Sequence, residues 1–179
     1  MGVSTGQDYI ERLRDDRQLY VNGERIADVT KYKPYQGVIH ELASLYDKQR
    51  EAPYAEAMTY PSPSTGEPVS TSFLMAKTWD QIEHRIRGER ARCELTYGLM
   101  GRLPDFMNAF VADIALIRDI LNRSDPRFGE NARQYYELCR EQDLCLTHTL
   151  LDPQLDRSQG THAQESVRIV KETDAGIVV

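Results

Sequence analysis

The stretch TWDQIEHRIRGERARCELTYGLMGRLPDFMNAFVADIALIRDILNRSDPRFGENARQYYELCRE, residues 78–141, decides the fold class of this sequence. Apolar residues recur in it every three or four positions, which is the period of an amphipathic α-helix. Two breaks divide the stretch, at residues 101–104 and at Asp125-Pro126, because glycine commonly ends a helix and proline commonly begins one. The stretch therefore predicts three amphipathic helices joined by short turns, which is a mainly α-helical bundle.

Each of these three predicted helices has one face that we expect to be buried. Thr78 is the expected N-cap of the first helix, and Gln81 is expected to reach back and complete a capping box. The expected core positions are Trp79, Ile82, Ile86, Cys93 and Tyr97 in the first helix, Phe106, Phe110, Ile114, Ile117 and Leu121 in the second, and Phe128, Ala132, Tyr135 and Cys139 in the third. In the third helix the charged residues Arg133, Glu137 and Arg140 are left for solvent.

Shorter patterns precede this stretch. Thr5 and Asp8 can cap a first helix that runs to about Arg14, and the Asn22-Gly23 turn predicts a small β-ribbon over residues 18–26. A helix is predicted from Pro34 to about Arg50, with one apolar face made of Val38, Ile39, Leu42, Leu45 and Tyr46. Residues 59–70, TYPSPSTGEPVS, hold three prolines and a glycine, so we expect a loop that acts as a linker.

The period of the sequence changes from helical to extended at Leu144. Strands are predicted over residues 144–151, 166–170 and 177–179, with a turn at residues 173–176. Two or three strands alone leave their edges unpaired, so the chain looks truncated within a β domain. We therefore divide it into a helical domain, residues 1–142, and the start of a β domain, residues 143–179.

Composition excludes several classes of protein. The chain has 179 residues, with 22 Lys and Arg against 28 Asp and Glu, and its net charge of −6 argues against a nucleic-acid binder. With 40% hydrophobic residues and no apolar run of membrane-spanning length or signal peptide, we expect a soluble cytoplasmic protein that does not bind membranes. Its three cysteines imply neither a disulfide framework nor a zinc site, and we expect no metal.

Two residues stand out as chemical candidates. His148 lies inside an otherwise apolar predicted strand, where a histidine either satisfies a buried hydrogen bond or faces a pocket. Arg102 lies at the junction between two predicted helices. It is either a surface charge paired with Asp105 or a clamp for an anion or phenolate near a helix N-terminus. The sequence contains no GxGxxG, P-loop, HExxH or GxSxG motif. It therefore lacks the motifs that would indicate a nucleotide-binding protein, a zinc protease or a serine hydrolase.

Several runs of the sequence, taken in order, resemble the amino-terminal part of the 4-hydroxyphenylacetate 3-monooxygenase (large component) family. They are residues 5–25, 60–66, 95–108, 131–137, 143–158 and 172–179. The resemblance implies an acyl-CoA-dehydrogenase-like fold, with an amino-terminal helical domain followed by the first strands of an incomplete middle β-barrel domain. It also implies an oxygenase that uses reduced FAD from a separate flavin reductase, together with O2, to hydroxylate a phenol ortho to its hydroxyl. The full-length protein would be a homotetramer.

The resemblance also assigns roles to individual residues. Arg102 and His148 match positions that hydrogen-bond the substrate phenol and so act in catalysis. Phe106 stands where the family usually has a substrate-binding tyrosine, which leaves the identity of the phenol open. The positions that match the flavin-lining segment are Thr147, His148, Asp152, Pro153 and Gln154.

Two alternatives to an oxygenase come from other classes. The chain could be a truncated, catalytically inactive helical interaction domain of such a protein. It could also resemble the 4-hydroxybutyryl-CoA dehydratases of the same fold family, which bind an iron–sulfur cluster through cysteines. Those cysteines would fall near Tyr97 and Gly101, and neither position is cysteine here, so this alternative is remote.

Overall fold

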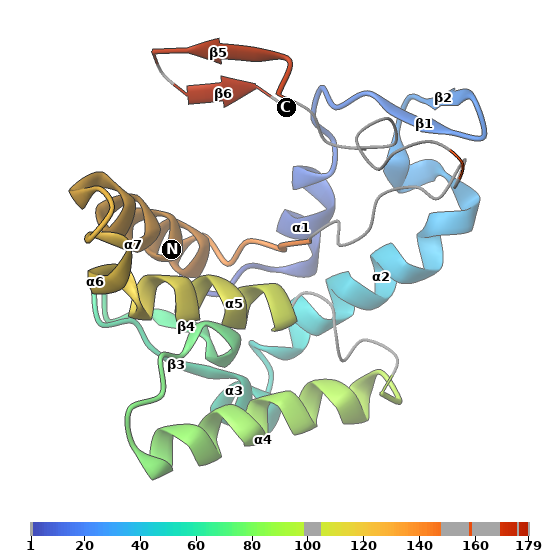
Figure 1. The fold of residues 1–179 in the computed structure, drawn as a ribbon. Coiled ribbons are helices and arrows are strands. Elements are labelled where there is room, and N and C mark those ends of the chain that lie inside the picture. The colour runs from blue at the N-terminus through green and yellow to red at the C-terminus, as the bar shows by residue number, and fades with distance from the viewer. Residues whose placement is uncertain (1, 99–104, 148–157, 159–168, 175, 179) are drawn as a thin grey trace. The chain divides into compact units, whose positions relative to one another are not determined.

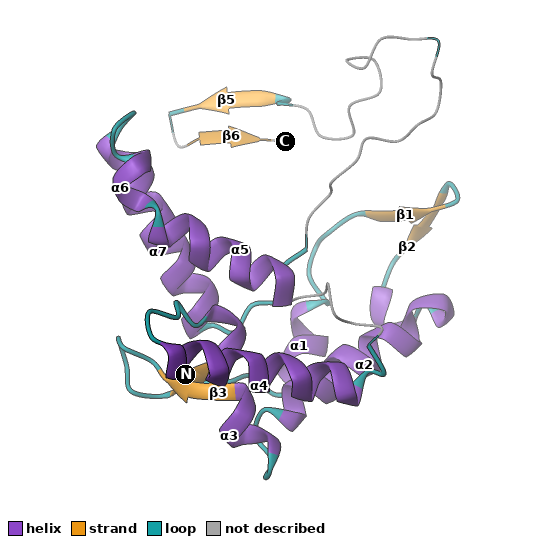
Figure 2. Ribbon diagram, turned by 60° about the horizontal axis from the view of Figure 1, so that its bottom comes forward, coloured by secondary structure: helices purple, strands orange, loops and turns teal. Residues whose placement is uncertain are grey.

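The computed structural model describes residues 2–98, 105–147, 158, 169–174 and 176–178 (Figure 1). Its contacts divide the chain into two units, residues 1–147 and residues 148–179. Among the described residues every helix belongs to the first unit, and the strands form three separate two-stranded hairpins (Figure 2). The expected mainly helical class is therefore confirmed.

The amino-terminal elements follow the predictions closely. Helix α1, Gly6–Arg12, begins with the expected capping box between Thr5 and Asp8. Strands β1, Leu19–Val21, and β2, Glu24–Ile26, pair antiparallel around Asn22 and Gly23. These two turn residues have φ values of 52° and 83°, the left-handed conformations that an Asn-Gly hairpin turn requires.

Helix α2, Lys33–Lys48, follows the 3₁₀ helix η1, Val29–Lys31. It packs on α1 through a core in which the rings of Tyr9 and Tyr46 stack with their centroids 5.2 Å apart. Of the five predicted apolar positions of α2 only Val38 is exposed. The first core cluster consists of Tyr9, Ile39, Leu42, Ala43, Leu45 and Tyr46.

Residues 59–70 form a hairpin, so the expectation of a linker loop was wrong. After the short helix α3, Tyr54–Met58, strand β3, Thr59–Pro61, pairs antiparallel with β4, Pro68–Ser70. The prolines are tolerated because Pro61 and Pro68 face each other in the last pair of the ladder, next to the loop, where few backbone hydrogen bonds are lost. Val69 is completely buried, and the 3₁₀ helix η2, Thr71–Phe73, follows directly.

The three helices of residues 78–141 exist, with the second divided in two. They are α4, Trp79–Leu95, α5, Asp105–Leu116, α6, Arg118–Leu121, and α7, Pro126–Glu141. Thr78 caps α4, but Gln81 accepts a hydrogen bond from the backbone N–H of Lys77, so the predicted capping box is incomplete. Helix α4 ends at Leu95, earlier than the expected stop at Gly101, which lies outside the described residues.

The face of α4 that its apolar spacing indicated as core is exposed. Trp79 is 80% exposed and Tyr97 is 92% exposed, whereas Gly88, Ala91 and Arg92 are buried. The reason is a close approach of backbones, because a Cβ at Gly88 would lie 2.2 Å from Thr71 Oγ1 and 2.9 Å from the carbonyl oxygen of Ala57. Helix α4 therefore turns its glycine, and not its large apolar residues, toward α3 and η2.

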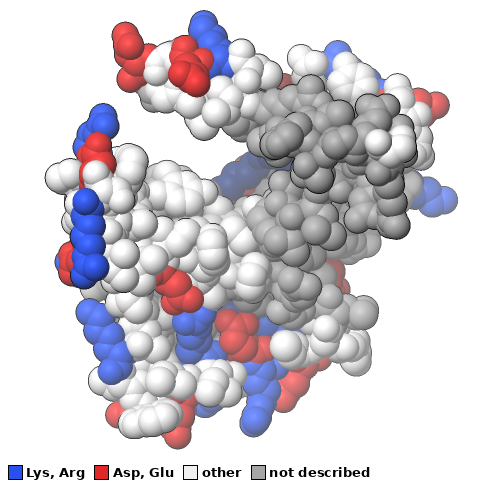
Figure 3. Space-filling model, in the orientation of Figure 1, with Lys and Arg blue, Asp and Glu red and all other residues white. Residues whose placement is uncertain are grey.

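The predicted faces of α5 and α7 are also only partly right. Small residues bring α5 close to η2 and α7. As a result, the side of α5 and of α7 that is buried differs from the predicted one. The second core cluster consists of Phe73, Val111, Ala112, Ala115, Tyr136 and Cys139. Of the residues predicted for the cores of α5 and α7, this cluster contains Cys139. The predicted core residues that are exposed here are Phe106, Phe110, Ile117, Phe128 and Tyr135. Figure 3 shows a largely uncharged surface over α5, with charged side chains along the edge where α6 lies.

Arg140 is buried, although α7 was expected to leave it in solvent. Only 3% of Arg140 is exposed, and its guanidinium group lies 4.9 Å from the centroid of the Tyr136 ring. Its Nη2 donates to Ser64 Oγ at 2.7 Å, and its Nε donates to Glu141 Oε1 at 2.7 Å. Ser64 belongs to the loop of the β3–β4 hairpin, which was not predicted from the sequence, so this hairpin helps to bury Arg140.

The carboxyl-terminal strands differ from the prediction in position. Residues 144–147 join no sheet within the described parts of the chain, and the rest of that predicted strand lies outside them. Strands β5, Lys171–Thr173, and β6, Gly176–Val178, pair antiparallel with Thr173 opposite Gly176, which confirms the predicted turn. No helix in the described ranges is both long and apolar enough to cross a bilayer.

Candidate functional site

The segment that leads toward the candidate site begins with a tight turn at the end of α7. Asp143 has a φ of 49°, a left-handed conformation that few residues other than glycine, asparagine and aspartate adopt. The backbone N–H of Leu144 donates to the carbonyl of Cys139 at 3.0 Å, and that of Asp143 donates to the carbonyl of Arg140 at 3.3 Å. This pair of bonds is a Schellman motif, which ends the helix and redirects the chain into residues 144–147.

Asp143 is buried at this turn and is held by four donors from distant parts of the first unit. Its Oδ2 accepts from the backbone N–H of Ser4 at 3.0 Å and from Gln49 Nε2 at 3.1 Å. Its carbonyl oxygen accepts from Tyr46 Oη at 3.2 Å and from Arg12 Nη1 at 3.3 Å. Burial raises the pKa of the Asp143 carboxyl group, and the bonds from Ser4 and Gln49 act against that rise.

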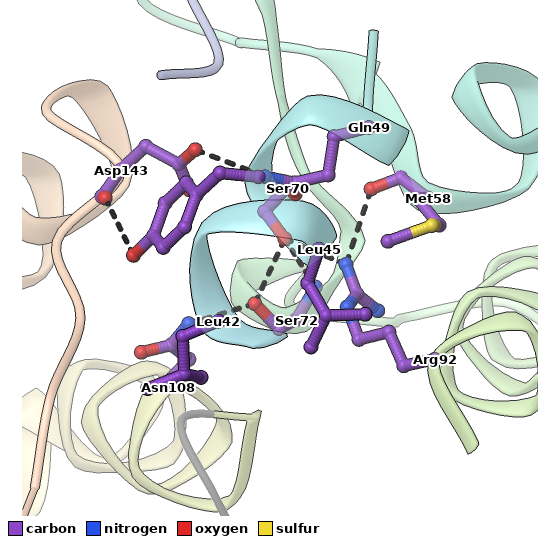
Figure 4. Close-up of a pocket in the computed structure, with 10 residues that line it drawn as sticks. Leu42, Leu45, Gln49, Met58, Ser70, Ser72, Arg92, Asn108 and Asp143 are labelled. Carbon is purple, nitrogen blue, oxygen red and sulfur yellow. Dashed lines mark hydrogen bonds between the residues drawn. The ribbon is translucent and has the colours of Figure 1, made fainter. Parts of the chain in front are cut away.

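A buried polar cluster lies beside this turn, between α2, α4, α5 and β4 (Figure 4). Arg92 Nη2 donates to Ser70 Oγ at 2.7 Å and to the carbonyl of Met58 at 3.3 Å. Ser70 Oγ lies 3.0 Å from Ser72 Oγ, which accepts from Asn108 Nδ2 at 2.8 Å. The cavity among these residues has a volume of about 20 Å³, room for a water molecule and not for a flavin or a phenol. This cluster is therefore structural.

Two larger cavities flank residues 144–147. One, of about 340 Å³, lies on the side of α1 and α2, and Arg12, Arg17 and Tyr9 line it. Burial raises the pKa of Tyr9 to about 12, so this phenol is neutral at physiological pH. The guanidinium group of Arg17 hydrogen-bonds Asp15 and lowers the pKa of that carboxyl group to about 2. This cavity therefore presents cationic and hydrogen-bonding groups.

The second cavity, of about 210 Å³, lies on the other side of the segment, between α5 and α7. Its lining is mostly apolar and aromatic, with Phe110 and Tyr135 as its largest side chains. Burial raises the pKa of Tyr135. Thr147, the last residue of the first unit, is exposed and borders both cavities. The segment thus lies between this cavity and the larger one, which is also lined largely by apolar residues but includes Arg12 and Arg17.

The structure describes two of the residues proposed from the sequence for the site. Phe106 lies in the first turn of α5 and is 42% exposed. Phe110, one helical turn later, lines the apolar cavity, which Thr147 also borders. Arg102, His148, Asp152, Pro153 and Gln154 lie outside the described residues. The predicted meeting of Arg102 with His148 stays a prediction.

Asp143 and the buried cluster were not predicted from the sequence. Asp143 follows α7 directly, where an aspartate reads as an ordinary helix end, and its partners lie 94 and more residues away in the sequence. Arg92 lies in a charged stretch of α4, where nothing local marks it as buried. Cys139 is buried, as predicted, whereas Cys93, which was predicted to lie in the core, is only half-buried, as is Cys145. In the part of the chain that the structure describes, no group of His, Cys, Asp and Glu side chains could hold a metal ion.

Comparison with known proteins gives consistent results. The chain is 38% identical over 184 residues to the 4-hydroxyphenylacetate 3-monooxygenase oxygenase component of Geobacillus sp. (strain PA-9), a match that covers 100% of this chain and 37% of the relative. It is 36% identical over 180 residues to the protein of that name from Thermus thermophilus, covering 98% of this chain and 36% of the relative. The chain therefore spans little more than a third of the length of these relatives.

Solved structures agree with the sequence matches. The oxygenase component (HpaB) of 4-hydroxyphenylacetate 3-monooxygenase, complexed with FAD and 4-hydroxyphenylacetate, superposes with a TM-score of 0.83 at 35% identity, over 97% of this chain and 36% of that one. A 4-hydroxybutyryl-CoA dehydratase from N. maritimus superposes with a TM-score of 0.76 at 19% identity, a likeness of fold alone. The family model described as "4-hydroxyphenylacetate 3-hydroxylase N terminal" matches residues 5–179. Since this match covers nearly the whole sequence, the chain belongs to the 4-hydroxyphenylacetate 3-hydroxylase family and carries its amino-terminal part.

Proposed function

We propose that the full-length protein is the oxygenase component of a two-component, flavin-dependent monooxygenase that hydroxylates a phenol ortho to its hydroxyl group. The observation that carries this proposal is the family match over residues 5–179, together with a solved relative that binds FAD and 4-hydroxyphenylacetate and superposes on 97% of this chain. The chain spans 36% of that relative, so the activity belongs to the whole protein.

In this proposal the chain's own residues bind and polarise the phenol. Arg102 and His148 hydrogen-bond the phenol oxygen and stabilise the developing phenolate, which raises electron density at the ortho carbon. Reduced FAD, when bound, supplies activation of O2. The expected flavin-lining segment includes Thr147, His148, Asp152, Pro153 and Gln154. Thr147 is compatible with this role because its side chain is exposed at the border of two cavities.

The proposal extends to architecture and partners. It includes the acyl-CoA-dehydrogenase-like arrangement, in which residues 1–142 are the helical domain and residues 143–179 begin a β-barrel domain, and a homotetrameric full-length protein. The name "oxygenase component" carried by the relatives supports a separate reductase. Because reduced FAD must diffuse from that reductase to the oxygenase, both proteins share one compartment, which we propose is the cytoplasm.

The deciding experiment assays the full-length protein with enzymatically reduced FAD, O2 and a panel of para-substituted phenols that includes 4-hydroxyphenylacetate. We expect a catechol from at least one phenol, detected by chromatography, and none when the oxygenase is omitted. Formation of peroxide alone with every phenol, by a folded protein that binds FAD, would contradict the proposal.

The Phe106→Tyr variant tests whether position 106 contacts the phenol. A tyrosine hydroxyl that reaches the phenol oxygen adds one hydrogen bond, which strengthens binding by about 0.5–1.5 kcal/mol, or about two- to twelvefold in Kd. If the surroundings are apolar, the hydroxyl is buried without a partner and binding weakens. Equilibrium titration with 4-hydroxyphenylacetate measures both outcomes. An unchanged Kd would show that Phe106 has only a packing role.

A further inference from the structure

We infer that Asp143 is a positioning residue for the site, because it fixes the register of the segment that carries Thr147 and leads into His148. This inference rests on the proposed function, which gives Thr147 and His148 their roles. The way residues 143–147 are held within the first unit does not depend on that function.

The first observation is that the turn is tied through both its side chain and its backbone. Two donors, from Ser4 and Gln49, reach the Asp143 carboxylate, and two others, from Tyr46 and Arg12, reach its carbonyl oxygen. These donors come from the segment before α1, from α1, from α2 and from Gln49, the residue that caps the end of α2. A helix end needs only the two Schellman bonds, so four additional bonds fix the turn relative to α1 and α2.

The second observation is the alternation that follows the turn. Leu144 and Leu146 pack against the second core cluster, around Phe73, whereas Cys145 packs against the first core cluster, around Tyr9. A shift of one residue would exchange these side chains between the two cores. Among the described residues no strand pairs with residues 144–147, so within this part of the chain the turn and the contacts of these side chains with the two cores are what oppose such a shift. The fixed starting point at Asp143 therefore sets the register.

The third observation is where this register ends. Thr147 lies four residues after Asp143 and borders both cavities. His148 is the next residue in the sequence. An error in register at Asp143 is passed on to these two positions, which the proposed function places against the flavin and the phenol.

The test compares three variants in the full-length protein. Asp143→Gly keeps the left-handed turn accessible but removes the carboxylate that Ser4 and Gln49 bind. Asp143→Asn keeps an oxygen acceptor and tolerates the same φ, so it is the conservative rescue. Val69→Ala shortens a completely buried side chain of β4 outside this segment, and it controls for a general loss of stability.

The first readout is amide hydrogen exchange of residues 144–147, measured without FAD at a temperature where each variant is folded. We expect exchange to rise about tenfold or more in Asp143→Gly, because bonds that close the local structure are lost. We expect less change in Asp143→Asn and none confined to this segment in Val69→Ala. Exchange that is unchanged in a folded Asp143→Gly protein would overturn the inference, whatever the activity of the enzyme.

The second readout is the ratio of catechol formed to O2 consumed. A merely stabilising role predicts that this ratio stays constant in the folded variants, whereas a positioning role predicts that it falls severalfold in Asp143→Gly and recovers in Asp143→Asn. A constant ratio in Asp143→Gly would overturn the inference, whereas failure of the wild type to form any catechol would overturn the proposed function instead.

A milder variant decides the case if Asp143→Gly does not fold. Tyr46→Phe removes only the hydroxyl that donates to the Asp143 carbonyl and keeps the ring that stacks on Tyr9. We expect a smaller rise in exchange of the same segment and a smaller fall in the product-to-O2 ratio. A folded Tyr46→Phe protein with wild-type values of both quantities would contradict the inference.

Discussion

Helices α2 and α4 have nearly the same length, yet one buries its large apolar residues and the other exposes them. In α2, Leu45 and Tyr46 lie in the first core cluster, as their spacing indicated. In α4, Ile86 faces outward in this structure, and the contact is made by Gly88 and Arg92. The comparison teaches that apolar spacing locates a buried face only where the neighbouring element can accept bulky side chains.

The neighbours of the two helices explain the difference. Helix α2 meets α1, and their interface has room for stacked tyrosine rings. Helix α4 meets α3 and η2, whose backbone carbonyl and hydroxyl groups lie so close that only a glycine fits at the crossing. One helix is therefore held mainly by apolar burial, and the other by close backbone approach and by hydrogen bonds from Arg92.

The largest expected effect is in the apolar contact of α2. Leu45→Ala removes buried methyl groups and leaves a cavity in the first core cluster, which we expect to lower the free energy of unfolding by about 2–5 kcal/mol. Chemical denaturation followed by circular dichroism measures it. A loss below about 1 kcal/mol would mean that this core is not what holds α2.

An intermediate effect is expected at the crossing of α4. Gly88→Ala adds a methyl group that would meet Thr71 Oγ1 and the carbonyl of Ala57, and we expect a loss of about 1–3 kcal/mol. Gly37→Ala in α2 is the matched control, since a Cβ there meets nothing within 4 Å and should stabilise the protein by about 0.4–1 kcal/mol. Opposite signs in the two variants, read from the same denaturation curves, would confirm the close approach, and a stabilised Gly88→Ala would refute it.

The smallest effect is expected on the exposed face of α4. Ile86 is 54% exposed, so Ile86→Ala in the 179-residue chain should change the free energy of unfolding by no more than about 0.5 kcal/mol. The alanine also has the higher helix propensity, which offsets part of the lost contact. Thermal unfolding of the wild-type and Ile86→Ala chains under the same conditions measures this change. A loss above about 1.5 kcal/mol would show that this face is buried and that the contrast with α2 is wrong.

The sequence predicted elements better than contacts. The capping residues Thr5, Thr78 and Asp125 and the Asn22-Gly23 turn act through neighbours a few residues away, so their effects are visible locally. The β3–β4 hairpin was missed because its prolines were read as breakers, although they stand at the end of the ladder.

In the site, too, the sequence indicated local features but not contacts between residues far apart in the chain. Phe106 and Thr147 came from the family resemblance, and their roles stay predictions: Phe106 is 42% exposed on α5, and Thr147 borders the apolar cavity. Asp143 and Arg140 could not be found in this way. Their burial depends on Ser4, Gln49 and Ser64, which are brought to them only by the folded chain.

The bond between Ser4 and Asp143 also has a consequence for synthesis of the protein. Its two partners are 139 residues apart, and at about 5–20 residues per second a ribosome needs about 7–28 s between them. Helices α1 and α2 are already outside the ribosome for much of that interval and can pair, since all of their mutual contacts are encoded early. The turn at Asp143 closes afterwards, so the segment bordering both cavities is the last part of the first unit to take its place on the growing chain.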